Sequence, residues 1–141
     1  MKWLAWENVG VDRMACVWLI RRFIDPQAEF HFIPAGQKPH QDGVEPFDIP
    51  GVKYSHRRGH CTFVTFLKEH NLKDPVLHQI GRIVDEADVV QDVALEPVSP
   101  GLDMLCRGVR RISHDDYEAI ERGCLLYDAL YAELANSTSS L

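Results

Sequence analysis

The sequence predicts an α+β domain in which a small three-stranded sheet near the N-terminus packs with about five α-helices. A strand, a helix and a second strand follow one another before residue 34, and segments with helical periodicity fill most of the later chain. The chain has 141 residues, of which 45% are apolar, so it suits one domain with a buried core. We expect this single domain to span residues 1–134, and the small polar residues 135–141 to form a flexible tail.

The first elements predict a β-α-β unit. Residues 2–6 favour a strand, and residues 13–24 favour an apolar helix that Asp12 would cap. Asp25–Pro26 ends this helix, because the residue before a proline disfavours the helical region. The alternating residues 29–33 predict a second strand, which lies parallel to the first when a helix connects the two.

The later chain is predicted to be mostly helical. Residues 34–50 are rich in proline and glycine and predict a loop, and residues 52–55 predict the third strand. Each of the two pairs Asp74–Pro75 and Ser99–Pro100 is typical of a helix start, with a capping residue before a proline. Ser113 with Asp116 resembles a capping box. The helical segments are therefore expected at residues 59–71, 74–88, 99–109 and 113–134.

The composition argues against several functions. The formal net charge is −6 and the basic residues cluster only locally, so we expect no direct nucleic-acid binding. No apolar run approaches the roughly 20 residues of a membrane span, and the N-terminus does not resemble a signal peptide. The four cysteines lie far apart without a CxxC pair, which indicates reduced thiols in a cytoplasmic protein and neither a disulfide scaffold nor a structural zinc site.

The helix predicted over residues 13–24 carries charges although it is apolar around nearly its whole circumference. Charges on a buried helix need partners, so one interpretation pairs the arginines with acids elsewhere. In the other interpretation Arg13, with Arg21 or Arg22, lines a cleft and binds a small oxyanion or carboxylate through planar donors. Arg13 and Cys16 would then be the candidate catalytic groups, Cys16 as a thiol.

Two further clusters contain side chains that can bind a metal. His56 and His60 lie four residues apart at the start of the helix expected from residue 59, and histidine is both a common ligand and a general base. Asp85 and Asp88 lie near a helix end, where acids oppose the helix dipole. Such acids can ligate a divalent transition metal (Fe, Mn, Ni or Zn) or form an acid/base pair. A solvated loop and a solvated acidic helix end are the structural alternatives.

Five stretches of the sequence together form a recognisable signature. They are VDRMACVWLIRRFIDP (11–26), EFHF (29–32), PFDIPGVKYSH (46–56), CTF (61–63) and YDALY (127–131). They resemble the C-terminal domain of the chromate-resistance protein ChrB, over nearly the whole chain. The resemblance implies a cytoplasmic role in chromate stress, as a sensor or a detoxifying accessory. Full-length members have an additional N-terminal part that would bind DNA. The present sequence resembles only their C-terminal domain, so we expect a stand-alone domain here.

The resemblance also implies a metal site and exposes one departure from the family pattern. Many similar proteins place an acid directly after the CTF motif, and some place a histidine at the position of Asp85. Together with His56 these residues would bind a metal. Here Val64 stands at the position of the acid. The site is then either rearranged to His56, His60, Asp85 and Asp88, or lost.

Three functions therefore stay open. The protein is a metal-binding protein or a metal-dependent enzyme acting on a small anion such as chromate, with bound Fe, Mn, Ni or Zn. Alternatively, it is a non-catalytic sensor that binds chromate or a similar oxyanion at its arginines. The third hypothesis is an oligomerisation module that forms a homodimer through its C-terminal helices. Direct chromate reduction is disfavoured, because the sequence has no dinucleotide fingerprint and no cysteines paired in sequence.

Overall fold

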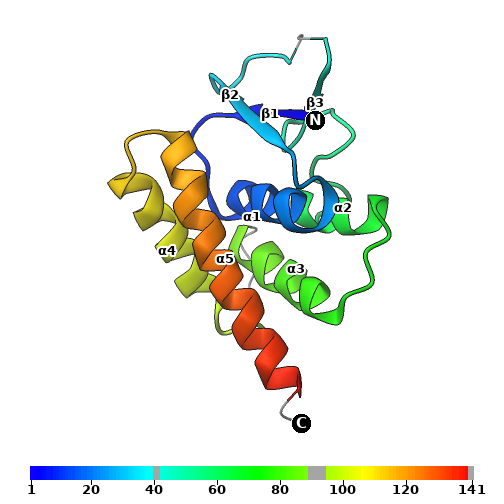
Figure 1. The fold of residues 1–141 in the computed structure, drawn as a ribbon, viewed down its shortest axis with the longest axis vertical. Coiled ribbons are helices and arrows are strands. Elements are labelled where there is room, and N and C mark those ends of the chain that lie inside the picture. The colour runs from blue at the N-terminus through cyan, green and yellow to red at the C-terminus, as the bar shows by residue number, and fades with distance from the viewer. Residues whose placement is uncertain (40–41, 89–94, 140–141) are drawn as a thin grey trace.

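The computed structural model describes residues 1–39, 42–88 and 95–139 and confirms the α+β class. Within these residues, β1 (Lys2–Trp6), β2 (Glu29–Ile33) and β3 (Val44–Pro46) form a parallel sheet in the order β2-β1-β3. The α-helices are α1 (Val11–Leu19), α2 (Thr62–Glu69), α3 (Pro75–Asp88), α4 (Ser99–Ile112) and α5 (Asp116–Ser139). Figure 1 shows the sheet at one end of the molecule, next to α1, and the long α5 running away from it.

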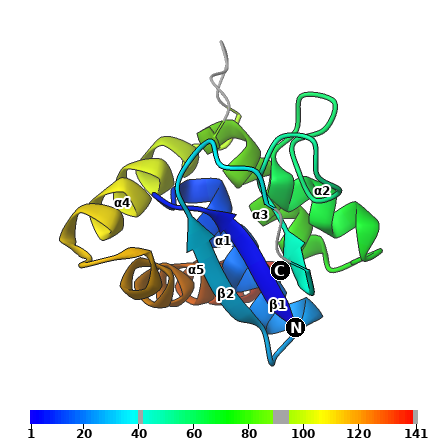
Figure 2. The same ribbon diagram turned by 90° about the horizontal axis from the view of Figure 1, so that it is seen from above.

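Helix α1 is the centre of the core. It contacts each of the other α-helices, and all its residues except Arg13 are buried. Figure 2 shows the sheet lying across α1, with α4 and α5 towards one side and α2 and α3 towards the other. A π-helix, η1 (Ile20–Ile24), continues α1 and is followed by Asp25 in an extended conformation, so the helix ends where the Asp25–Pro26 pair predicts.

The predicted β-α-β unit is confirmed, but the predicted third strand is wrong. Strand β1 pairs in parallel with β2 along its whole length. The third strand is β3, and the expected residues 52–55 contribute only an isolated bridge between Tyr54 and Phe47. Tyr54 instead stacks on Phe66 of α2, with ring centroids 4.4 Å apart. Residues 40–41 of the expected loop lie outside the described residues.

The local signals place some helix starts correctly. Helix α3 begins at Pro75 as predicted, and Asp74 accepts a hydrogen bond from the Val76 N–H at 2.9 Å. Helix α2 begins at Thr62 and not at Gly59, because a tight turn over residues 57–60 precedes it.

For the last two helices, the sequence predicts the wrong capping residue. Helix α4 begins at Ser99 with Val98 as its N-cap, since the Ser99 hydroxyl donates to the Ile83 carbonyl. The predicted Ser113–Asp116 capping box is wrong, because Asp115 accepts the N–H of Glu118 at the start of α5. Ser113 instead donates its hydroxyl to a carbonyl in α4.

Helix α5 runs further than the sequence predicts. It includes residues 135–139, which were expected in the tail, while residues 140–141 lie outside the described residues. Among the described helices, none combines the length and the apolar character that crossing a membrane requires.

Candidate metal centre

The first turn of α2 is capped by carboxylates from two other helices. Asp12 of α1 accepts the N–H groups of Thr62 at 2.9 Å and Phe63 at 3.0 Å, and Asp85 of α3 accepts the N–H of Cys61 at 2.7 Å. These N–H groups have no partner inside their own helix, so the carboxylates stabilise α2. The prediction that Asp12 caps its own helix is wrong, because Asp12 lies inside α1 and serves α2.

His56 lies among acids that come from three separate parts of the chain. Its Nε2 atom is 2.7 Å from Oδ2 of Asp88 and 3.8 Å from Oδ2 of Asp12. Its Nδ1 atom is 3.5 Å from Oδ1 of Asp48 and 3.1 Å from Oγ1 of Thr62. The hydrogen bond to Asp88 and the nearby carboxylates raise the pKa of His56 to about 9.

Asp48 and Thr62 hold this arrangement together. Asp48 follows β3 in a left-handed conformation, with φ 55°. Its Oδ2 accepts a hydrogen bond from Nε of Arg13 at 2.9 Å, and its Oδ1 accepts one from Oγ1 of Thr62 at 2.7 Å. The Thr62 side chain is fully buried. Both carboxylate oxygens of Asp48 are therefore fixed in place beside His56.

Three carboxylates face one small pocket. Asp12, Asp48 and Asp88 line a pocket of about 210 Å³ together with Arg13. Asp12 is only 3% exposed, and its burial, followed by the negative charges of Asp48 and Asp88, raises its pKa to about 7. One donor atom from each of Asp12, Asp48 and His56 lies within 4.8 Å of the other two. A divalent cation among them would offset the repulsion between the acids.

The four predicted metal ligands form two separate pairs. His56 pairs with Asp88, and Nδ1 of His60 pairs with Oδ2 of Asp85 at 2.7 Å. Oδ1 of Asp85 caps α2. In the part of the chain that the structure describes, Asp12 and Asp48 lie beside His56, where His60 and Asp85 were expected.

Arg13 connects two separate segments of the chain through its guanidinium. Its Nε donates to Asp48, and its Nη1 donates to the backbone carbonyls of residues 6–8. These contacts tie the end of β1 to the loop that carries Asp48. The guanidinium is thereby engaged with protein acceptors, which favours the structural interpretation of this arginine.

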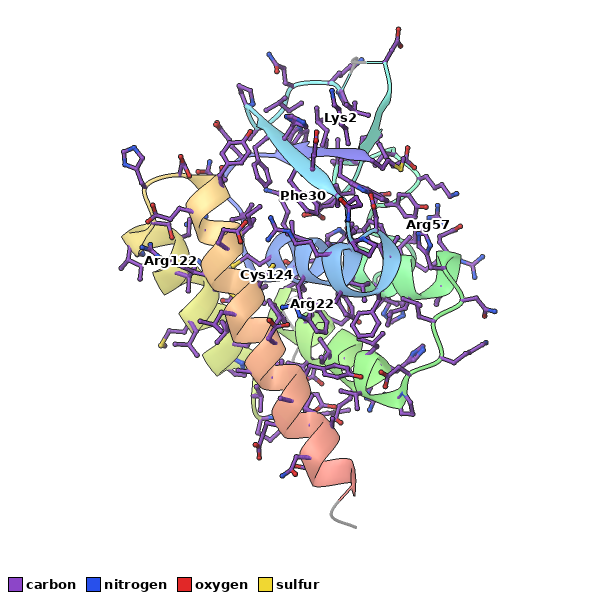
Figure 3. The ribbon with its side chains drawn as sticks, in the orientation of Figure 1. Lys2, Arg22, Phe30, Arg57, Arg122 and Cys124 are labelled. Carbon is purple, nitrogen blue, oxygen red and sulfur yellow. The ribbon has the colours of Figure 1, made fainter. Side chains whose placement is uncertain are left out.

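Arg21 and Arg22 lie against α5 and not beside Arg13. Arg21 pairs with Glu121 at 2.7 Å, and Arg22 binds both carboxylate oxygens of Asp128. Figure 3 shows Arg22 and Cys124 together near α5, well apart from Arg57 near α2. The three arginines therefore do not form one anion site.

The thiol of Cys16 is poorly placed for nucleophilic chemistry. It is fully buried, and its Sγ lies 3.7 Å from Oδ1 of Asp12. Burial, together with the nearby acids, raises its pKa well above the ordinary value. Since the thiolate is the reactive form, this environment disfavours Cys16 as a nucleophile.

Similarity to known protein families identifies the family of this chain. The family described as "ChrB, C-terminal domain" matches residues 3–134. The chain belongs to the ChrB C-terminal domain family. The resemblance found in the sequence is thereby confirmed.

A curated relative supports the same conclusion. Protein ChrB of Cupriavidus metallidurans is 32% identical over 139 residues, which cover 96% of this chain and 41% of that protein. The chain thus spans about two fifths of the length of this relative. No solved structure is significantly similar to the present chain. In this ChrB domain, Asp12, Asp48 and His56 all lie within the stretches 11–26 and 46–56 that first indicated the family.

Proposed function

We propose that this ChrB C-terminal domain binds one divalent transition-metal ion at His56, with Asp12, Asp48 and Asp88 as the acidic ligands. The observation that supports the proposal is the convergence of three carboxylates on one imidazole, with Asp12 almost fully buried. Carboxylate oxygens and imidazole nitrogens are donors that suit Fe, Mn, Ni and Zn. Arg13, which pairs with Asp48, and His56 balance only part of the charge of the three acids, and a bound cation would offset the repulsion that remains.

The hydrogen bonds of the cluster are compatible with ligation. Each carboxylate offers about four lone-pair positions, and the N–H groups of α2 use only two of those on Asp12. His56 would exchange its proton for the metal, because an imidazole ligates in its neutral form. The pocket beside Asp12 would let a small molecule reach an ion held by these residues.

Membership of the ChrB family supports a role in chromate resistance, which we propose takes place in the cytoplasm. The ion would act on a small anion such as chromate, or would form part of a sensor for such an anion. Oxyanion binding at Arg13, Arg21 and Arg22 stays a prediction that their carboxylate partners do not favour.

Metal analysis of the purified protein tests the proposal. We expect one equivalent of a transition metal, or thermal stabilisation by added Fe, Mn, Ni or Zn. His56→Gln and Asp88→Asn should each weaken binding at least about tenfold, since even outer-shell partners contribute 10–100-fold. His78→Gln is the matched control, because His78 is exposed and binds the Leu72 carbonyl.

Two results would contradict the metal site. In the first, the wild-type protein contains no stoichiometric metal and gains no stability from any of the four ions. In the second, His56→Gln binds the metal as tightly as His78→Gln does.

Self-association is a second candidate function, because α4 and α5 enclose an apolar groove of about 420 Å³. Leu105, Leu126 and Leu130 line it, and Leu105 is 57% exposed. The predicted homodimer would cover this groove with a second copy of the chain. Light scattering that shows only monomer would rule it out.

A further inference from the structure

A second pocket, on the outer side of α2, is lined by basic side chains. It has a volume of about 240 Å³, and its charged lining consists of Arg57, Arg58, His60, Lys68 and Glu69. Such a concentration of basic groups is unusual in a chain with a net charge of −6. None of the proposed acidic metal ligands lines it, since Asp12, Asp48 and Asp88 line a different pocket.

The acid of this second pocket is already balanced by two cations. Arg57 donates to Glu69 at 2.7 Å and to the Lys53 carbonyl at 2.5 Å, and the Lys53 ammonium lies 4.0 Å from Glu69. By contrast, the side chains of Arg58 and Lys68 make no ion pair or hydrogen bond with any residue in the described parts of the chain. Two positive charges are therefore left uncompensated around one pocket.

The backbone of Arg58 provides independent support for a binding role. Residues 57–60 form a tight turn, in which the N–H of His60 donates to the Arg57 carbonyl at 2.9 Å and the reverse bond is 3.1 Å. Both central residues are left-handed, with φ 51° at Arg58 and 79° at Gly59. Asparagine and glycine favour such a turn, whereas arginine adopts it at a conformational cost. Strain of this kind is concentrated at functional sites.

We propose that Arg58 and Lys68 bind a doubly charged tetrahedral oxyanion in this pocket, either free or as the terminal phosphate of a small ester. The guanidinium of Arg58 supplies planar, forked donors, and the ammonium of Lys68 supplies a compact charge. His60 also lines the pocket, and its Nδ1 is held by Asp85 at 2.7 Å, so the imidazole forms a fixed wall of the site. The site is independent of the proposed metal ion, because none of His56, Asp12, Asp48 and Asp88 takes part.

Calorimetric titration of the metal-free protein tests this site. The probes are sulfate, inorganic phosphate and phenyl phosphate, with sodium chloride at matched ionic strength as the blank. We expect saturable binding to the wild-type protein. Arg58→Asn and Lys68→Gln should each weaken it about 10–100-fold, the usual value of one hydrogen bond to a charged group. Arg111→Gln, which removes an exposed arginine from α4, should leave it unchanged.

The stability of the variants separates loss of binding from loss of folding. Asparagine tolerates the left-handed conformation, so Arg58→Asn should melt at the wild-type temperature or above it while losing the anion. Lys68→Gln changes only an exposed position of α2. Tighter binding of phenyl phosphate than of sulfate would identify an ester as the ligand, and equal binding a free oxyanion. The proposal is overturned if no probe binds above the chloride blank, or if both variants bind as the wild type does.

Discussion

Replacing Thr62 by valine tests how α2 supports the candidate metal centre. The Thr62 side chain is fully buried, and its hydroxyl donates to Asp48 at 2.7 Å and lies 3.1 Å from Nδ1 of His56. Valine keeps the shape of the side chain and removes the hydroxyl, so Asp48 loses a charge-assisted hydrogen bond. Because a hydrogen bond to a charged group contributes about 1.5–3 kcal/mol, we expect the free energy of unfolding to fall by about that amount.

Thr65→Val is the matched control on the same helix. The Thr65 side chain is also buried, and its hydroxyl donates to the backbone carbonyl of Ser55 at 2.6 Å. This acceptor is neutral, so the same substitution should cost only about 0.5–1.5 kcal/mol. The difference between the two variants isolates the contribution of the charged acceptor from the effect of placing valine in α2.

Urea denaturation of the metal-free variants, with unchanged m-values, measures this difference in unfolding free energy. Calorimetric metal titration supplies the second measurement. Thr62→Val should weaken metal binding about 10–100-fold, because Thr62 orients both Asp48 and His56, and Thr65→Val should leave it unchanged. The reasoning is refuted if Thr62→Val loses no more stability than Thr65→Val and still binds the metal as tightly as the wild type.

Two further predictions concern stability away from this centre. Burial lowers the pKa of His70 from its ordinary 6.5. As the pH drops, His70 therefore takes up its proton at a higher pH in the unfolded chain than in the folded one, and stability should fall as the pH drops through about 6.5. His70→Gln should reduce the change in urea midpoint between about pH 7.5 and about pH 5.5, and an identical change would contradict this. Asp116 accepts the N–H groups of Asn8 and Val9 at 2.9 Å. Asp116→Ala should therefore lower the melting temperature by about 3–8 °C, for roughly 1–2 kcal/mol, and an unchanged calorimetric transition would exclude this role.

The sequence predicts those parts of the fold that depend on local signals. The Asp25–Pro26 pair ends the first helix, and Asp74 marks the start of α3, because both effects act within a few residues. The third strand fails for a non-local reason. The apolar pattern around Tyr54 reflects its stacking on Phe66, while β3 contains a proline that is tolerated at a sheet edge.

The candidate site is only partly predictable for the same reason. His56 and Asp88 are identified from residue type and meet at 2.7 Å in the fold, although they are far apart in the sequence. Asp12 is read as a cap for its own helix, because no local pattern reveals that it caps a helix 50 residues later. Asp48 stands in a proline-rich loop without a diagnostic spacing. Its position inside the family stretch 46–56 is the one signal that singles it out.

The proposed metal centre is coupled to the packing of the core, because one of its ligands also caps the N-terminus of α2. Asp12 joins α1 to α2 through two backbone N–H groups and is also a proposed ligand. A cation that binds only the folded protein would add RT ln(1 + [L]/Kd) to stability, about 2.7 kcal/mol at 100 times Kd. A substitution at Asp12 therefore removes a helix cap and a ligand together, and the resulting instability would not identify the metal site. Asp88 lies exposed at the end of α3 and does not cap α2, so ligation is tested more directly there.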